Sequence, residues 1–191
     1  MWRALWVFLT VLSLLSTREA VAARQVSPKD VALRLSDLPA GFTQIQGRFY
    51  TNAQAVALDG VSLATLNGHG RLLSYDARYQ RSLLVGIVET DDTVAAYKTS
   101  TGAHWDYMRV TANARSSQLR RMSARSVGSE RAGYTYSKIV KRVNLTVDAV
   151  LFRRGSYTVL VQIVGVTGSF NPGEVTRLAQ IIDRRARLSS H

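Results

Sequence analysis

The sequence predicts an α+β fold in which an antiparallel sheet of about five to six strands is covered by helices. Three patterns carry this prediction. Apolar residues alternate over residues 134–166, as in consecutive antiparallel strands, and they recur at helical spacing over residues 175–186. A second helical stripe separates this block from earlier strand-like stretches. This order of elements is typical of helices packed on an antiparallel sheet.

The first part of the chain after residue 26 predicts a short helix, a strand and a second short helix. The first helix occupies residues 27–38, because Ser27 suits the N-cap and Pro28 suits the first helical position. Residues 42–50 alternate loosely between apolar and polar side chains, which predicts a strand. Residues 52–58 predict one or two helical turns.

The middle of the chain predicts two strands followed by the longest internal helix. The strands are expected at residues 72–79 and 83–90. Asp91 and Asp92 are interpreted as the start of the helix, because carboxylates stabilise a helix N-terminus. The polar and basic residues 111–131 predict a loop that leads into a short strand. The stripe of the helix consists of Val94, Tyr97, Thr101, Trp105 and Met108.

The last third of the chain predicts a three-strand meander and a closing helix. Residues 134–141 form the first strand, and residues 153–156 form a hairpin turn in which a glycine can adopt a positive φ. Residues 157–166 are apolar on both faces, so this strand is expected to be central and covered on both sides. The closing helix begins near residues 171–174. Its apolar side consists of Val175, Leu178, Ala179, Ile182 and Ala186.

Residues 1–23 predict a secretory signal peptide, and residues 24–191 predict a single exported α+β domain. Arg3 supplies the positive start, residues 4–15 form a short apolar run, and residues 20–23 are small, as at a signal peptidase site. An uncleaved anchor is the alternative. No later segment is apolar for 18 residues, so no transmembrane span is expected after cleavage.

The charge of the chain predicts an anionic partner outside the cytoplasm. There are 25 Lys and Arg residues against 13 Asp and Glu residues, which gives a formal net charge of +12. A protein with this surplus is attracted to anionic surfaces at low salt, so an anionic envelope surface is one expected partner. Nucleic acid is not expected, because no RNP-type motif is present and export separates the protein from most nucleic acid.

Four short stretches of the chain match a shared set of motifs, and they are residues 35–42, 126–131, 150–157 and 178–184. The motifs are an early D-L-P-x-G-F, a V-G-D-E-type step, an F-R-x-G-N-type hairpin and a last helix that ends in A-x-x-x-D-R. In these stretches the chain resembles a broad group of bacterial exported proteins and sensor ectodomains. Some members resemble the Mog1/PsbP-like α/β/α sandwich, including the LpqN-type mycobacterial lipoproteins. The resemblance covers about half of the mature chain and implies an uncharacterised extracytoplasmic domain with no catalytic residue to carry over.

This chain departs from the group at Ser129, where an acid is commoner, and at Ser156, where Asn is commoner. It also lacks the cysteine that carries the lipid of a lipoprotein.

The residue types of the chain exclude several classes of enzyme. There is no cysteine, no G-x-S-x-G elbow, no S-x-x-K motif, no P-loop and no G-x-G-x-x-G fingerprint. His69, His104 and His191 do not have zinc-ligand spacing. We therefore expect no catalytic residue, no metal site and no cofactor.

The best candidate for a binding site is a group of basic residues. Arginine binds phosphate and carboxylate through paired hydrogen bonds, so these side chains suit an anionic ligand. Solvated charges on a loop are the alternative explanation. The candidate residues are Arg120, Arg121, Arg125, Lys138 and Arg142.

The function predicted from these observations is a non-enzymatic extracytoplasmic binding domain. Its ligand is expected to be an anionic envelope component or a small apolar molecule held between the sheet and a helix. One alternative is an envelope hydrolase that uses Glu89, Asp91 or His104, and it requires those side chains to converge in one cleft. The other is a structural or assembly partner that binds through an exposed sheet edge. The sequence does not predict an oligomeric state.

Overall fold

The computed structural model describes residues 26–82, 86–115 and 119–189. These residues form one seven-stranded sheet with helices packed on it. Every neighbouring pair of strands is antiparallel, and their order across the sheet is β1-β2-β3-β7-β6-β5-β4. The α+β prediction is confirmed, with more strands than the five to six expected. The predicted signal peptide, residues 1–23, lies outside the described residues.

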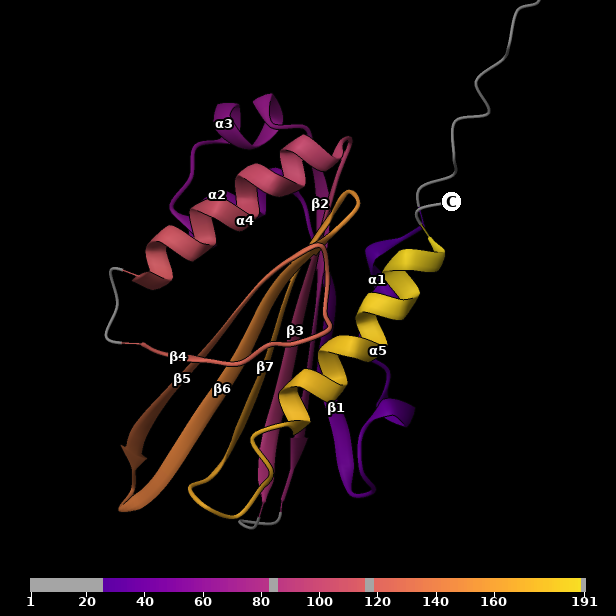
Figure 1. Cartoon of the computed structure of the whole chain (residues 1–191). Helices are drawn as coiled ribbons and strands as arrows, with labels where there is room; N and C mark the ends of the chain where they lie inside the picture. Colours follow the sequence, from indigo (N-terminus) through magenta and orange to yellow (C-terminus); the bar gives the residue numbers. More distant parts are fainter. Residues whose placement is uncertain (1–25, 83–85, 116–118, 190–191) are drawn as a thin grey trace, which may run out of the picture.

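The chain forms seven strands, five α-helices and one 3₁₀ turn in its described residues (Figure 1). The strands are β1 (Phe42–Tyr50), β2 (Arg71–Arg81), β3 (Ile87–Tyr97), β4 (Arg120–Met122), β5 (Glu130–Val140), β6 (Val143–Arg154) and β7 (Tyr157–Val166). The α-helices are α1 (Pro28–Val31), α2 (Asn52–Asp59), α3 (Leu63–Gly68), α4 (Ser100–Arg115) and α5 (Glu174–Leu188), and a 3₁₀ turn spans Leu35–Asp37. No helix in the described ranges is both long enough and apolar enough to cross a bilayer.

Helices cover both faces of the sheet. Figure 1 shows α5 and α1 on one side, whereas α4 lies across the other side with α2 and α3 beyond it. Strand β7 is the fourth of the seven strands, so the prediction of a central strand covered on both sides is confirmed. The two covered faces differ in character, and that difference determines where a ligand can bind.

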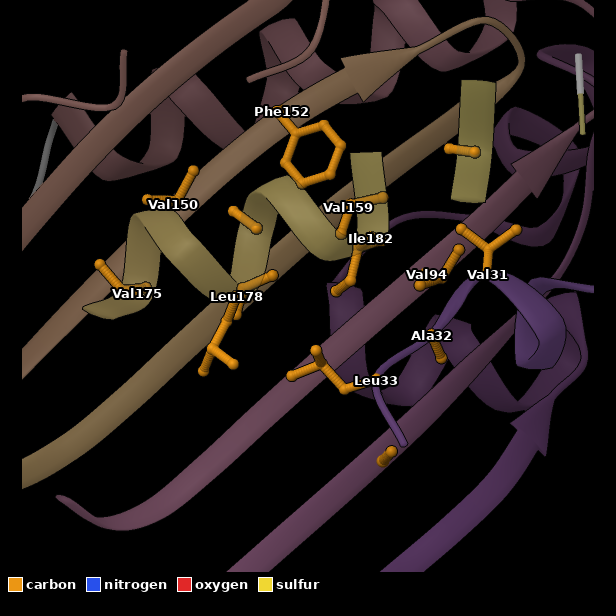
Figure 2. Close-up of a cluster of buried hydrophobic side chains, with 14 of the residues drawn as sticks. Val31, Ala32, Leu33, Val94, Val150, Phe152, Val159, Val175, Leu178 and Ile182 are labelled. Carbon is orange, nitrogen blue, oxygen red and sulfur yellow. The ribbon is translucent and has the colours of Figure 1, made fainter. Parts of the chain in front are cut away.

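The apolar core lies between the sheet and the α5/α1 layer (Figure 2). The predicted apolar side of α5 is at most 1 % exposed at every position, which confirms the helical pattern. It packs on alternate residues of the central strands, where Val159 and Phe152 have no exposed surface. Burial of a side chain of this size contributes about 1.5–3 kcal/mol, so this layer supplies most of the apolar stabilisation.

The prediction that Asp91 and Asp92 begin a helix is wrong. Both lie inside strand β3, and α4 begins only at Ser100. The strand forms because its alternate side chains suit two different faces: Val94 packs in the apolar core, whereas Asp91 makes an ion pair with Arg78 of β2. The predicted stripe is therefore divided between a strand and a helix.

The remaining predictions for single elements hold with shifts at their ends. Helix α1 stops at Val31 rather than near residue 38, and Ser27 makes no side-chain cap hydrogen bond. Helix α4 extends to Arg115 into the stretch expected as a loop, and the short strand β4 follows. The predicted strand at residues 83–90 falls partly on residues 83–85, which are not described. The turn before β7 has Gly155 at φ +54°.

Three contacts fix α4 above the sheet. Thr158 of β7 donates its hydroxyl to the carbonyl of Ala103 at 2.9 Å. The ring of Trp105 stacks on His69 with centroids 3.9 Å apart. A Cβ atom added at Gly102 would lie 2.1 Å from the carbonyl oxygen of His69, so glycine permits this close approach. The helix is thereby held at one end of the sheet face and leaves the rest of that face open.

We predict that Ile182→Ala lowers the free energy of unfolding by about 2–5 kcal/mol, because it leaves a cavity under α5. Urea denaturation followed by circular dichroism measures the change. Leu188→Ala on the same helix is the control, since Leu188 is 79 % exposed and its truncation should change stability little. Equal losses in the two variants would contradict the assignment of α5 as the main cover of the core.

Candidate binding cleft between helix α4 and the sheet

A cleft of about 630 Å³ lies on the α4 face of the sheet. Its floor is made by the outward-facing residues of β1, β2, β3 and β7, and its walls are α2 and α4. Sites for small molecules commonly have volumes of about 300–1,000 Å³, so this cleft is large enough for one. The polar residues of its lining include Arg48, Tyr50, Asp59, Arg71, Ser74, Asp76, Arg78, Asp106 and Arg109.

Arg71 is a buried guanidinium that donates its side-chain hydrogen bonds to neutral groups. It is only 6 % exposed, and it donates to the amide oxygen of Asn52 and to the hydroxyl of Ser74, each at 2.8 Å. Among the described residues no carboxylate lies within ion-pair distance of it. The carboxyls of Asp59 and Asp76 are near enough to attract it, but neither forms an ion pair with it, and a buried charge without a directly paired counter-ion lowers stability.

Arg48 lies on the neighbouring edge strand and is exposed to the cleft. Its guanidinium stands over the ring of Tyr50, 4.3 Å from the ring centroid, and its Nε donates to the Tyr50 hydroxyl. These contacts orient the guanidinium without neutralising it. Within the resolved ranges Arg48 forms no ion pair, so the cleft contains a second arginine available to an anion.

Two carboxyl groups of the cleft are held partly away from water. Burial raises the pKa of Asp76, and the charge of Asp59 raises it further, although a hydrogen bond with Thr93 and the charges of Arg48 and Arg71 oppose the shift. Burial likewise raises the pKa of Asp59, against the attraction of Arg109 and Arg71. The Oδ1 atom of Asp76 is buried and has no protein hydrogen-bond partner. It can therefore accept a hydrogen bond from a ligand.

The α4 wall carries an ion pair of its own. Arg109 and Asp106 lie one turn apart, and the Nη2 atom of Arg109 is 2.7 Å from the Oδ1 atom of Asp106. Burial raises the pKa of the Tyr97 phenol of β3, and the negative charge of Asp106 beside it adds to the shift. Arg109 is thus engaged within the protein, whereas Arg71 and Arg48 are the cations with capacity for a ligand.

The cleft continues into a smaller hollow over the middle of β3, lined there by Asp91, Asp92 and Thr93. Arg78 lies there between Asp91, with an Nε to Oδ1 distance of 2.8 Å, and Glu89, at 3.9 Å. Burial raises the pKa of Glu89, and Asp91 beside it adds to the shift. Glu89 and Asp91 are two residues apart on β3, and both carboxyls lie against the Arg78 guanidinium, so they are already paired with a cation of the protein.

The third residue of the hydrolase alternative lies elsewhere. His104 bonds Glu130 through Nδ1 at 2.8 Å, beside Arg153. Across the sheet, Glu130 of β5 pairs with residue 153 of β6, which pairs with residue 158 of β7, which in turn pairs with residue 95 of β3. Residue 95 is six positions along β3 from Glu89. At about 3.3 Å per residue this separates the two groups by about 20 Å. The described structure therefore does not bring Glu89, Asp91 and His104 into one cleft.

The basic residues predicted as a single site occupy three places. Arg120 and Arg121 are neighbours on the edge strand β4, so their side chains leave opposite faces, and Arg121 lies over the ring of Tyr134 at 5.0 Å. Arg125 lines a shallow hollow beside the start of α5. Lys138 is near the end of β5 and Arg142 is in the turn that follows. None of the five lines the main cleft.

The residues that form the cleft were missed by the sequence analysis, although they have a pattern. Ser74, Asp76 and Arg78 alternate with the buried Tyr75, Ala77 and Tyr79 along β2. Gln46 and Arg48 add two polar residues at alternate positions of β1. A strand with one apolar and one charged face is the signal that marks such a surface. We find no group of three His, Asp or Glu residues placed to hold a metal ion in the described ranges.

Comparison with known proteins adds little to this geometry. No family model matches the chain, and no curated protein matches it. Among solved structures, the extracellular domain of PknH from Mycobacterium tuberculosis is similar, with a TM-score of 0.46 and 10% sequence identity, covering 85% of this chain and 98% of that domain. A likeness at this level establishes neither a shared family nor a shared ligand. The resemblance to Mog1/PsbP-like proteins stays a prediction.

We predict that Asp76→Asn stabilises the protein at neutral pH. The folded-state pKa of Asp76 is raised above its ordinary value of 3.8, so ionisation of this carboxyl lowers stability as the pH rises through that raised pKa. The stability gained by the variant should be present at about pH 7 and should vanish near pH 3.5. Urea denaturation across this range measures it.

Asp37→Asn is the matched variant of opposite sign. Burial alone would raise the pKa of Asp37, but its hydrogen bonds with Arg185 and with the Arg34 N–H outweigh burial and hold the pKa below 3.8. This variant should lose about 1.5–3 kcal/mol at neutral pH, and the loss should shrink as the pH falls through the lowered pKa. The same pH trend in both variants would contradict the account of the cleft carboxyl.

Proposed function

We propose that this chain is an extracytoplasmic, non-enzymatic binding domain that holds a small anionic ligand in the cleft under α4. The proposal includes a signal peptide at residues 1–23 and one exported domain at residues 24–191, both supported by the sequence pattern. Of the two ligand classes predicted from the sequence, the lining of the cleft favours the anionic one.

The observation that carries the proposal is the buried Arg71 guanidinium. It faces the cleft, it has neutral hydrogen-bond partners, and Asn52 and Ser74 fix its plane. A carboxylate or phosphate placed beside it would supply the directly bonded anion that neither Asp59 nor Asp76 provides, through charge-assisted hydrogen bonds. Arg48 lies on an adjacent strand of the same floor and can contact a second oxygen of the ligand.

The other residues that line the cleft indicate further chemical groups that the ligand should carry besides its negative charge. The buried Asp76 Oδ1 atom can accept a hydrogen bond from a hydroxyl or amine. Leu58, Val110 and Leu160 offer apolar surface for a carbon skeleton. The site therefore suits a small molecule with one anionic group and several hydroxyls, such as an acidic or phosphorylated sugar of the cell envelope. The ligand is proposed by chemical class only.

Binding fits this geometry better than hydrolysis does. The paired carboxyls of Glu89 and Asp91 are held by Arg78, and His104 lies about 20 Å along the sheet from them. The assembly alternative depends on the edge strands. One is three residues long and the other contains a bulge between Gln44 and Gln46, and both features discourage edge pairing.

We expect glucose 6-phosphate and glucuronate to bind the purified protein and glucose to bind much more weakly. The three probes share a sugar ring and differ in charge. Isothermal titration calorimetry at low salt measures the affinities. Arg71→Gln should weaken binding of both anionic probes at least about 10-fold, because it removes a hydrogen bond to a charged group.

Arg115→Gln is the control, because Arg115 is exposed at the end of α4, the helix that forms one wall of the cleft, but does not line the cleft. It removes the same charge and should leave the affinities within about two-fold. Equal affinity for glucose and the anionic probes, or an Arg71→Gln variant that binds as the parent does, would contradict the proposed function.

A further inference from the structure

The tip of the β5–β6 hairpin exposes apolar side chains to solvent. Ile139 is 74 % exposed and Val140 is 43 % exposed, although both are β-branched residues that strands usually cover. Figure 1 shows this hairpin running out at the lower end of the sheet, away from α3 and from the start of α4. The tip is therefore an apolar point that no helix of the described fold covers.

Cations surround this apolar point. The two turn residues are Lys141 and Arg142, both exposed, and neither forms an ion pair within the described part of the chain. Lys138 lies just before them, and its charge is close enough to Glu89 to oppose the rise that burial produces in the pKa of that acid. The tip as a whole remains positive, so its charge is complementary to an anionic surface.

The turn itself is built from unfavourable residues. Lys141 has φ +47° and Arg142 has φ +68°, a left-handed conformation that brings the Cβ atom close to the backbone and is adopted mainly by Gly, Asn and Asp. Asn-Gly is the sequence that such a two-residue turn prefers. Strained positions of this kind are concentrated at functional sites. The two cations at the outermost point of the hairpin therefore lower the stability of the turn relative to Asn-Gly.

We propose that the β5–β6 hairpin tip, residues 138–143, docks on anionic lipid bilayers, with Ile139 and Val140 entering the headgroup region and Lys141 and Arg142 contacting lipid phosphates. This surface is separate from the cleft and does not depend on the function proposed for it. The exposed apolar residues favour an anionic bilayer over a soluble polyanion as the partner. A soluble polyanion would use the cations alone, whereas a bilayer uses both the cations and the apolar side chains.

The absence of cysteine from the sequence makes a direct test possible. Ile139→Cys, labelled with the environment-sensitive fluorophore NBD, should show a blue shift and a rise in emission when vesicles of phosphatidylglycerol and phosphatidylcholine are added. Vesicles of phosphatidylcholine alone should produce little change. Arg184→Cys, labelled in the same way at an exposed position of α5, should show no shift with either vesicle.

A second test separates the turn from general attraction by charge. The double variant Lys141→Asn with Arg142→Gly should weaken binding to the anionic vesicles about 30-fold in co-sedimentation, at about five-fold per cation. Its melting temperature should stay equal or rise, because Asn-Gly suits the turn. Ile139→Thr should weaken binding several-fold while the charge is unchanged.

The matched control removes two cations from another part of the surface. Lys29 of α1 and Arg184 of α5 are exposed, and Figure 1 shows both helices well away from the tip of the β5–β6 hairpin. Lys29→Gln with Arg184→Gln should therefore leave the affinity within about two-fold. All variants keep residues 4–15, so any binding by that apolar run is common to them.

Three results would overturn the proposal. The first is vesicle binding without a blue shift at position 139, which would place the contact elsewhere. The second is an equal loss of binding in the turn variant and the control variant, which would show attraction by net charge alone. The third is a blue shift of the same size with heparin, which would show a polyanion site in place of a lipid site.

Discussion

The packing of α5 on one face of the sheet is the contact on which the rest of the structure depends. Strand β7 presents Val159, Val161 and Ile163 to this helix, and all three are fully buried. Because that single layer supplies most of the apolar burial, the opposite face is free of the same demand. The sheet can therefore present charged residues beneath α4 and remain folded.

The two faces of one strand show this division clearly. Along β3, Val94 and Ala96 pack under the α5/α1 layer, whereas Thr93 and Ala95 line the cleft. Small side chains on the cleft face leave space that larger ones would fill. The contact of Gly102 with His69 holds α4 at a fixed height above that space. The cleft exists because the β3 residues on this face are small and because α4 is held at a distance above them.

The elements that the sequence predicted correctly are those with a regular period and one environment. The closing helix and the 134–166 meander have long apolar patterns that only one secondary structure satisfies. The stretch from Asp91 to Tyr97 failed because β3 is buried on both faces. Its apolar residues no longer alternate cleanly, and two adjacent carboxylates imitate a helix start.

The cleft was harder to predict than the fold, because its residues come from five strands and two helices that only the tertiary structure brings together. Arg71 and Asp59 belong to different elements, and nothing in their local sequence relates them. The basic residues near position 120 looked like a site because they are close in sequence. In a strand, however, neighbours such as Arg120 and Arg121 face opposite ways.

The most direct test of the account is the state of the Arg71 guanidinium itself. Two-dimensional ¹⁵N NMR of the arginine side chains reports each guanidinium separately, and the Arg71→Lys variant assigns the resonance. The account predicts that inorganic phosphate, titrated at constant ionic strength, shifts the Arg71 resonance in a saturable way and leaves Arg115 in place. An Arg71 signal that stays unmoved at phosphate concentrations that shift exposed arginines would contradict the claim that this buried cation receives an anion.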